Sequence, residues 1–203
     1  MKIALIGATG NVGQRIVAEA LRRGHQVTAI ARDVSKVEAQ EGVTASQGDV
    51  ADPAGTADRL RGHDVAILSV RFQGLDFEKV LEAVKASGVP RLLVVGGAAS
   101  LEVAPGLALL DTPDFPDFIK PEATPARAAL DRLRREPAID WTFLSPSVFF
   151  GPGDRTGTFR LGADALLSDS EGKSHISYED YAIALLDEVE QPKHRRVRFT
   201  VGY

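Results

Sequence analysis

Three glycines spaced three residues apart are the residues of this sequence whose spacing points most directly to chemistry. Gly7, Gly10 and Gly13 follow a short apolar run, 3–6, and precede an apolar helical pattern, 12–21. Between a strand and a helix, such glycines let the chain turn sharply, let backbone approach a pyrophosphate, and let the helix pack closely on the strand. Free N–H groups and the positive dipole at the helix start attract phosphates. The stretch predicts a dinucleotide site, with a glycine turn without ligand as the alternative. Its candidate cofactor-binding residues are Gly7, Thr9, Gly10, Asn11, Val12 and Gly13.

The end of the next expected strand, 26–31, bears on which nucleotide would bind. Arg32 could pair with a ribose 2′-phosphate, whereas an acidic residue here would bond the 2′-hydroxyl and select NAD. Asp33 is adjacent, so both residue types are present. The alternative for Asp33 is the N-cap of a short helix that starts near Ser35, and we favour that structural role.

No pair of side chains has the spacing of a tyrosine general acid with its lysine partner. A lysine four residues after a tyrosine on a helix lowers the pKa of the phenol, so that the phenol can pass a proton. The residues four positions after Tyr178 and Tyr181 are Ala182 and Leu185, and the expected helix 122–135 contains neither tyrosine nor lysine. No histidine is placed to activate a serine, and no His, Asp and Glu cluster has metal-ligand spacing. We therefore assign no catalytic residue and no metal site.

The elements that must position these residues alternate between strands and helices. Apolar runs predict strands at 3–6, 26–31, 43–47, 64–69, 91–95, 140–144 and 195–201, with one or two short strands within 158–168. Amphipathic patterns predict helices at 12–21, 53–60, 75–87, 122–135 and 178–189. This alternation predicts an α/β fold, a doubly wound parallel sheet of the Rossmann type with strand order 3-2-1-4-5-6. Ligands of such sheets bind beyond the carboxyl ends of the strands, where the order reverses.

Residues at the later strand ends are expected along the same crevice. They are Ser69, Val70, Gly96, Gly97, Pro146 and Ser147. The connection 96–121 is rich in glycine and proline, and a long connection in a compact domain usually forms a lid or binding loop. Aromatic rings near the mouth could stack on a flat substrate. The candidate substrate contacts are Phe72, Phe115 and Phe149, with Phe118 and Phe150 nearby. The alternative is that Phe149 and Phe150 are core residues on opposite sides of an extended segment.

Composition narrows the class of protein. The chain of 203 residues is 44% hydrophobic and 26% charged, which is typical of one globular domain, here 1–203. A net charge of −4 argues against a nucleic-acid partner. Cysteine is absent, which excludes disulfides and cysteine nucleophiles. No signal-peptide pattern or membrane-length apolar run is present, so we expect a cytoplasmic protein without a membrane partner.

Several motifs resemble one family of reductases. The run Gly7-Ala8-Thr9-Gly10-Asn11-Val12-Gly13 resembles the GATGxxG fingerprint of extended and atypical short-chain dehydrogenase/reductases. The runs 94–101, 111–116, 141–146, 153–157 and 198–203 are similar to the NmrA-like atypical members, and among these to NADH-flavin reductases. The resemblance implies a single NAD(P)-binding Rossmann domain with a nicotinamide cofactor. It also implies a 2′-phosphate contact for Arg32, hence NADP(H) in preference to NAD(H), and an adenine contact for Asp49 and Val50. Alternatively, Asp49 only starts a turn before Pro53.

Three functions follow as hypotheses. The first is an NAD(P)H-dependent reductase that transfers hydride directly to a flavin, a quinone or a similar planar small molecule. Such rings accept hydride and spread the charge themselves, so that the protein mainly positions two flat rings and solvent supplies the proton. The second is a non-catalytic NADP(H)-binding redox sensor, as in NmrA-like regulators. The third, an epimerase or dehydratase, is disfavoured by the missing tyrosine–lysine pair. The acceptor's identity and the oligomeric state are left open.

Overall fold

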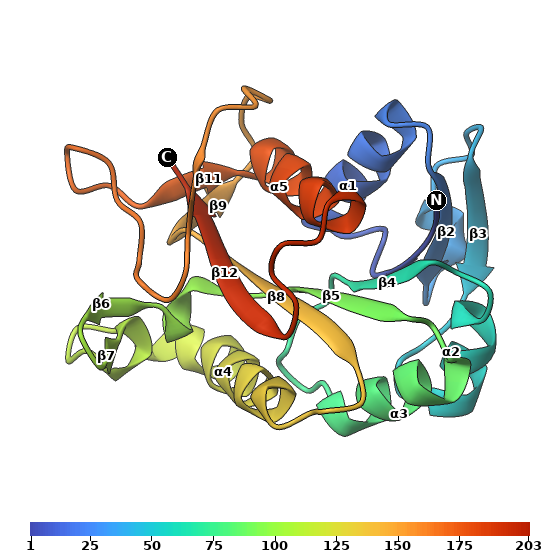
Figure 1. Ribbon diagram of the computed structural model, residues 1–203, viewed down its shortest axis with the longest axis horizontal. Helices are drawn as coiled ribbons and strands as arrows, with labels where there is room; N and C mark the ends of the chain where they lie inside the picture. The colour runs from blue at the N-terminus through green and yellow to red at the C-terminus, as the bar shows by residue number, and fades with distance from the viewer.

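The apolar runs of the sequence pair into one central sheet of eight strands (Figure 1), in a computed structural model that describes residues 1–203. The order is β3-β2-β1-β4-β5-β8-β12-β10, and only β10 runs antiparallel to its neighbour. The strands are β1 Lys2–Ile6, β2 Gln26–Ala31, β3 Val43–Gln47, β4 Val65–Leu68, β5 Arg91–Val95, β8 Asp140–Pro146, β12 Val197–Gly202 and β10 Arg160–Gly162. The predicted doubly wound order is confirmed, and β12 and β10 extend it at one edge.

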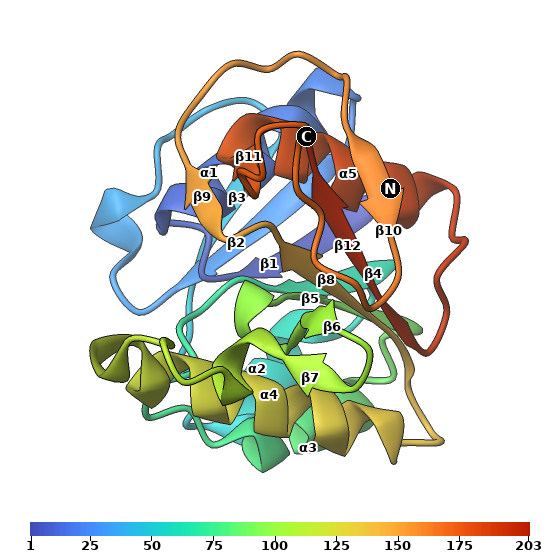
Figure 2. The same ribbon diagram turned by 90° about the vertical axis from the view of Figure 1, so that its left-hand side faces the viewer.

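Five α-helices cover the two faces of the sheet, α1 and α5 on one and α2, α3 and α4 on the other (Figures 1 and 2). Their bounds are α1 Asn11–Arg22, α2 Pro53–Leu60, α3 Phe77–Ser87, α4 Lys120–Arg134 and α5 Tyr178–Glu190. Successive side chains of a strand point to opposite faces. Ile3 and Leu5 accordingly pack in the core with α1 and α5, and Ala4 and Ile6 in the core with α3 and α4. The single α/β domain thus has a buried layer on each side of its sheet.

Helix starts follow the side chains available to cap them. Asp52, Asp76 and Ser177 accept backbone N–H groups at the starts of α2, α3 and α5. Asp33 accepts the N–H of Ser35 and caps the short turn η1, Val34–Lys36, as the capping interpretation predicted. Helix α4 starts two residues before the predicted position because Pro121 occupies its first turn, where a missing N–H costs nothing.

The connection between β5 and α4 contains no α-helix. It comprises the turns η2 Ala98–Ser100, η3 Leu109–Asp111 and η4 Asp117–Ile119, and a hairpin of β6 Glu102–Ala104 with β7 Leu107–Ala108. A separate parallel pair, β9 Phe149–Gly151 and β11 His175–Ser177, joins the segment after β8 to the start of α5. These irregular segments surround the carboxyl ends of β5 and β8.

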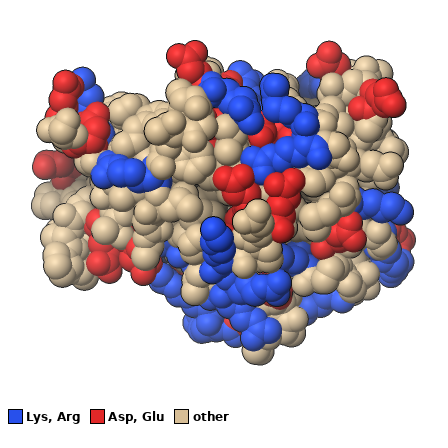
Figure 3. Space-filling view, turned by 45° about the horizontal axis from the view of Figure 1, so that its top comes forward, with Lys and Arg blue, Asp and Glu red and all other residues tan.

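Ion pairs tie the two helices of one face together. Arg23, the C-cap residue of α1, contacts Asp187 and Glu190 of α5, each at 2.8 Å. In Figure 3, where this face comes forward, acidic and basic side chains lie side by side. None of the helices is long and apolar enough to cross a bilayer.

Candidate active site

The glycine turn after β1 brings backbone groups too close together for side chains. Gly7 has a φ of +87°, in the left-handed region, and a Cβ there would lie 2.0 Å from the carbonyl oxygen of Ser69. A Cβ on Gly13 would lie 2.2 Å from the carbonyl oxygen of Gly7, so glycine allows α1 to pack against the turn. A Cβ on Gly10 would meet only that same oxygen, at 3.4 Å. The outer side of Gly10 is therefore open to a ligand.

The start of α1 presents backbone donors that the protein itself does not use. Gly10 is its N-cap residue and supplies no side-chain cap. The N–H groups of Asn11, Val12 and Gly13 have no acceptor within the protein. Since unpaired donors add to the positive end of the helix dipole, this helix start can hold an anion such as a pyrophosphate.

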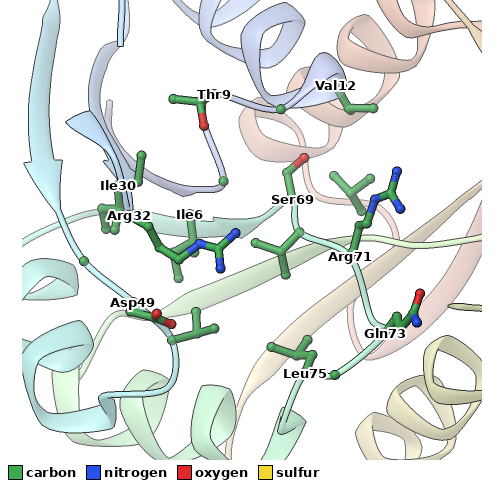
Figure 4. Close-up of a pocket in the computed structure, with 18 of the residues that line it drawn as sticks. Ile6, Thr9, Val12, Ile30, Arg32, Asp49, Ser69, Arg71, Gln73 and Leu75 are labelled. Atoms are coloured by element: carbon green, nitrogen blue, oxygen red, sulfur yellow. The ribbon is translucent and has the colours of Figure 1, made fainter. Parts of the chain in front are cut away.

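A cleft of about 900 Å³ extends from this helix start across the carboxyl ends of β1, β2 and β4 (Figure 4). It lies where the strand order reverses, between β1 and β4. Ten residues that the sequence predicted as cofactor-binding line it: Gly7, Thr9, Gly10, Asn11, Val12, Arg32, Asp49, Val50, Ser69 and Val70. Gly13 lies behind the turn and does not line this cleft. The structure therefore brings most of the predicted dinucleotide site together.

Two arginines extend into the cleft from opposite sides (Figure 4). Arg32 follows β2, Arg71 follows β4, and neither guanidinium has a hydrogen-bond or ion-pair partner in the protein. Lys79 also lines the cleft, and its Nζ donates to the carbonyl oxygen of Ala51 at 3.1 Å. Asp49 starts a turn by accepting the Ala51 N–H at 2.9 Å while it faces the cleft, so its geometry suits both roles considered above. The cleft thus offers two free cations for phosphates.

A smaller pocket of about 270 Å³ adjoins the cleft. The two cavities share four lining residues, Val70, Val95, Glu122 and Phe150. Besides Val70, six residues predicted from the sequence line the smaller pocket: Phe72, Gly96, Gly97, Phe115, Pro146 and Ser147. Four of these were predicted as cofactor contacts, so the structure places them beyond the main cleft, beside the predicted substrate residues Phe72 and Phe115.

Phe149 lines neither cavity, and its neighbour Phe150 lines both. Adjacent residues of an extended strand point in opposite directions. In β9 the Phe149 side chain is 69% exposed, whereas Phe150 packs edge-on to Tyr178 with ring centroids 4.7 Å apart. The ring of β9 that faces the cavities is therefore Phe150, and not Phe149 as predicted.

Glu122 connects two elements that border both cavities. Its Oε1 accepts the N–H of Phe72 at 2.7 Å, and its Oε2 accepts the N–H of Gln73 at 2.9 Å. The carboxylate of α4 therefore fixes the loop after β4, which carries Val70 and Arg71. Sequence reasoning missed Glu122, Arg71 and Lys79. Only Arg71 had a signal, its position two residues after the end of the predicted strand 64–69.

The tyrosines and histidines offer few proton donors. The Tyr181 hydroxyl is buried and donates to the carbonyl oxygen of Leu144 at 2.7 Å, and burial raises the pKa of Tyr181 well above its usual value. Tyr178 lines the cleft, with the guanidinium carbon of Arg15 5.9 Å from its ring centroid. None of the four histidines lines either cavity. Tyr178 is thus the phenol nearest to the site.

The glycine turn, the uncapped helix and the cleft at the strand-order reversal define a dinucleotide-binding Rossmann protein. Residues 7–192 match the family described as NAD(P)H-binding, and the chain belongs to that family.

Similar proteins agree with this assignment. An uncharacterized Bacillus subtilis protein, YwnB, is 43% identical over 99% of this chain and 98% of its own length. A Bacteroides thetaiotaomicron structure, provisionally named an epimerase, is 42% identical with a TM-score of 0.94, covering 100% of this chain and 96% of that one. A Streptococcus pneumoniae structure, provisionally named an NADH-flavin reductase, is 37% identical with a TM-score of 0.89, covering 100% and 99%. The resemblance expected from the sequence is confirmed at the level of the family.

Proposed function

We propose that this protein is an NADPH-dependent reductase of a planar small molecule such as a flavin or a quinone. The observation that carries the proposal is that the two cavities adjoin, so that a polar cleft with free cations shares part of its wall with an apolar pocket. Hydride transfer between two rings needs this arrangement, because it requires contact between a nicotinamide and its acceptor. We further propose a cytoplasmic location, which fractionation of cells would check.

The cleft fits a dinucleotide because its residues leave open space and unpaired hydrogen-bond donors. The open side of Gly10 and the free N–H groups of Asn11 and Val12 would receive the pyrophosphate. Arg32 would receive a ribose 2′-phosphate, and this contact makes NADP(H) the preferred cofactor. Val50 would lie against the adenine. When bound, the reduced nicotinamide supplies a hydride, so NADPH, the oxidised acceptor and H⁺ give NADP⁺ and the reduced acceptor.

The protein's part in the reaction is mainly positioning. Phe150 at the junction, with Phe72 and Phe115 in the smaller pocket, would hold the acceptor ring against the nicotinamide. Glu122 keeps the loop after β4 in place, so the shared wall stays fixed. No histidine lines the cavities, Tyr181 is buried, and Tyr178 at the cleft lacks a lysine four residues on, so solvent would provide the proton.

The test follows NADPH oxidation with riboflavin and with 2-methyl-1,4-naphthoquinone, alongside calorimetry of NADPH binding. We expect turnover with a rate of hydride transfer that changes little between about pH 6 and pH 8, since no tuned acid titrates there. Phe150→Leu should lower kcat/KM more than its strand neighbour variant Phe149→Leu, by about 0.5–1.5 kcal/mol of transition-state stabilisation.

Two results would contradict this mechanism in different ways. A steep pH profile that disappears in Tyr178→Phe would identify Tyr178 as a dedicated acid. Tight NADPH binding without turnover of either acceptor would instead favour the redox sensor.

A further inference from the structure

The smaller pocket leaves no charged side chain free for its ligand. Its four polar lining side chains have partners within the protein. Ser100 accepts from Arg198 (3.3 Å), Glu122 from the backbone of Phe72 and Gln73 (2.7 and 2.9 Å), Arg127 donates to Asp111 (2.6 Å), and Ser147 donates to the carbonyl oxygen of Val201 (3.1 Å). A charged ligand group that enters such a pocket would lose its hydration without a free counter-charge, which is costly. The pocket therefore suits an uncharged ring.

The segment 109–127, which contributes Glu122, Arg127 and several apolar residues to the wall of the pocket, has a net negative charge. It carries four carboxylates, Asp111, Asp114, Asp117 and Glu122, against two cations, Lys120 and Arg127. Both cations are paired, Lys120 with Asp117 at 2.7 Å and Arg127 with Asp111 at 2.6 Å, which leaves Asp114 and Glu122 without a cationic partner. A phosphate attached to the acceptor would meet like charge here. The free arginines, Arg32 and Arg71, line the cleft and not this pocket.

Two large apolar side chains are exposed at positions next in sequence to residues that line the pocket. Phe118 is 83% exposed and precedes Ile119, and Phe149 is 69% exposed and follows Val148. Ile119 and Val148 both line the pocket. At about 270 Å³ the pocket is slightly below the usual range of ligand sites, about 300–1,000 Å³, and has room for a ring system but not for a long chain as well. An apolar chain on the ring would lie over these exposed side chains and remove their surface from water.

We infer that the acceptor is an uncharged ring with an apolar substituent, such as a prenylated quinone, and not a phosphorylated flavin. This inference rests on the proposed reductase function and specifies its substrate class. The quinone receives the hydride from NADPH and one proton from solvent, and the products are NADP⁺ and the hydroquinone.

Two matched pairs of acceptors test the inference. Riboflavin and its 5′-phosphate, FMN, share one ring system and differ by a phosphate, and we expect kcat/KM for FMN to be about tenfold lower. 2-Methyl-1,4-naphthoquinone and its 3-prenyl derivative differ by an apolar chain, and we expect kcat/KM for the prenylated compound to be about tenfold higher.

Variants test which residues cause each preference: the segment 109–127 for the preference against a phosphate, and the exposed phenylalanines for the preference for an apolar chain. In the double variant Phe118→Ala/Phe149→Ala, the ratio of the kcat/KM values for the two quinones should be close to one. Leu161→Ala removes another half-exposed apolar side chain, which lines neither cavity, and should leave the ratio unchanged. The double variant Asp114→Asn/Asp117→Asn should narrow the difference in kcat/KM between riboflavin and FMN.

Measurements of binding distinguish a failure of this inference from a failure of the reductase proposal. The four compounds are titrated into the protein saturated with NADP⁺, where the same preferences should appear whether or not turnover occurs. Equal or tighter binding of FMN, with no advantage for the prenyl chain, would overturn the inference and leave reductase activity intact. A change of oligomeric state in Phe118→Ala/Phe149→Ala, with the quinone ratio unchanged, would also overturn it, because a second copy would then cover these side chains.

Discussion

Among single residues, the three glycines of the turn differ in the reason each must be small. Gly7 and Gly13 face backbone at distances that no Cβ tolerates, whereas Gly10 faces open space. Gly10→Val should therefore abolish NADPH binding and leave stability close to that of the parent. Gly13→Ala should destabilise the fold by about 1–3 kcal/mol, as overpacking does. Calorimetry and urea unfolding measure the two effects. Retained NADPH affinity in Gly10→Val would exclude this turn as the pyrophosphate site.

Arg32 tests the choice of nucleotide at the same scale. Because its guanidinium has no partner in the protein, its removal costs the fold no ion pair. Arg32→Ala should weaken NADPH binding by about 1.5–3 kcal/mol and NADH binding far less, since one charge-assisted hydrogen bond to the 2′-phosphate is lost. Lys36→Ala, a nearby exposed cation, is the control. If NADH binding fell equally, Arg32 would contact a group common to both nucleotides.

Between elements, the decisive contact is the one by which Glu122 of α4 holds the loop after β4. Glu122→Ala removes two hydrogen bonds to a carboxylate and should destabilise that loop by about 1–3 kcal/mol. Hydrogen exchange should then quicken at the N–H groups of Phe72 and Gln73, with partial rescue in Glu122→Gln. Glu82→Ala, at an exposed position of α3, should not alter this exchange. Unchanged protection in Glu122→Ala would show that packing alone holds the loop.

The same contact illustrates what could be predicted from the sequence. Strands β2, β3 and β5 have their predicted bounds, because short apolar runs between turn residues are local signals. The dinucleotide turn was equally readable, since all its glycines lie within seven residues. Glu122 and Phe72 lie 50 residues apart, and no local pattern relates them. The exchange of Phe149 for Phe150 depended on the register of β9 with β11, which is also a long-range pairing.

Over the whole molecule, buried carboxylates link stability to pH. Burial alone would raise the pKa of Glu19, but hydrogen bonds from Arg155 and Arg23 outweigh it and hold the pKa below its usual value. Burial would also raise the pKa of Glu188, but hydrogen bonds from the backbone and side chain of His194 outweigh this effect and lower the pKa. Groups with a lowered folded-state pKa stabilise the fold above their unfolded pKa, about 4.3, and this contribution is lost as pH falls through the folded pKa.

We therefore expect the free energy of unfolding to decrease steadily as pH falls from about 5 to 3. Urea unfolding at a series of pH values measures this dependence. Glu19→Gln should make it shallower, because one of the linked carboxylates is gone, and Glu82→Gln should not. Stability that stayed constant or rose over this range would contradict the role of these carboxylates.

The uncapped start of α1 means that the protein gives up stability in order to bind. A side-chain cap at a helix start typically contributes about 0.5–2 kcal/mol, and Asp52, Asp76 and Ser177 provide one for the other helices that begin at a capping residue. At Gly10 that contribution is missing until an anion arrives, so the resting fold is less robust than its sequence could make it. Ligand binding then stabilises the folded state by mass action. A dinucleotide at a hundred times its Kd adds about 2.7 kcal/mol to the free energy of unfolding. In a cell, the amount of folded protein would track the nucleotide pool that it uses.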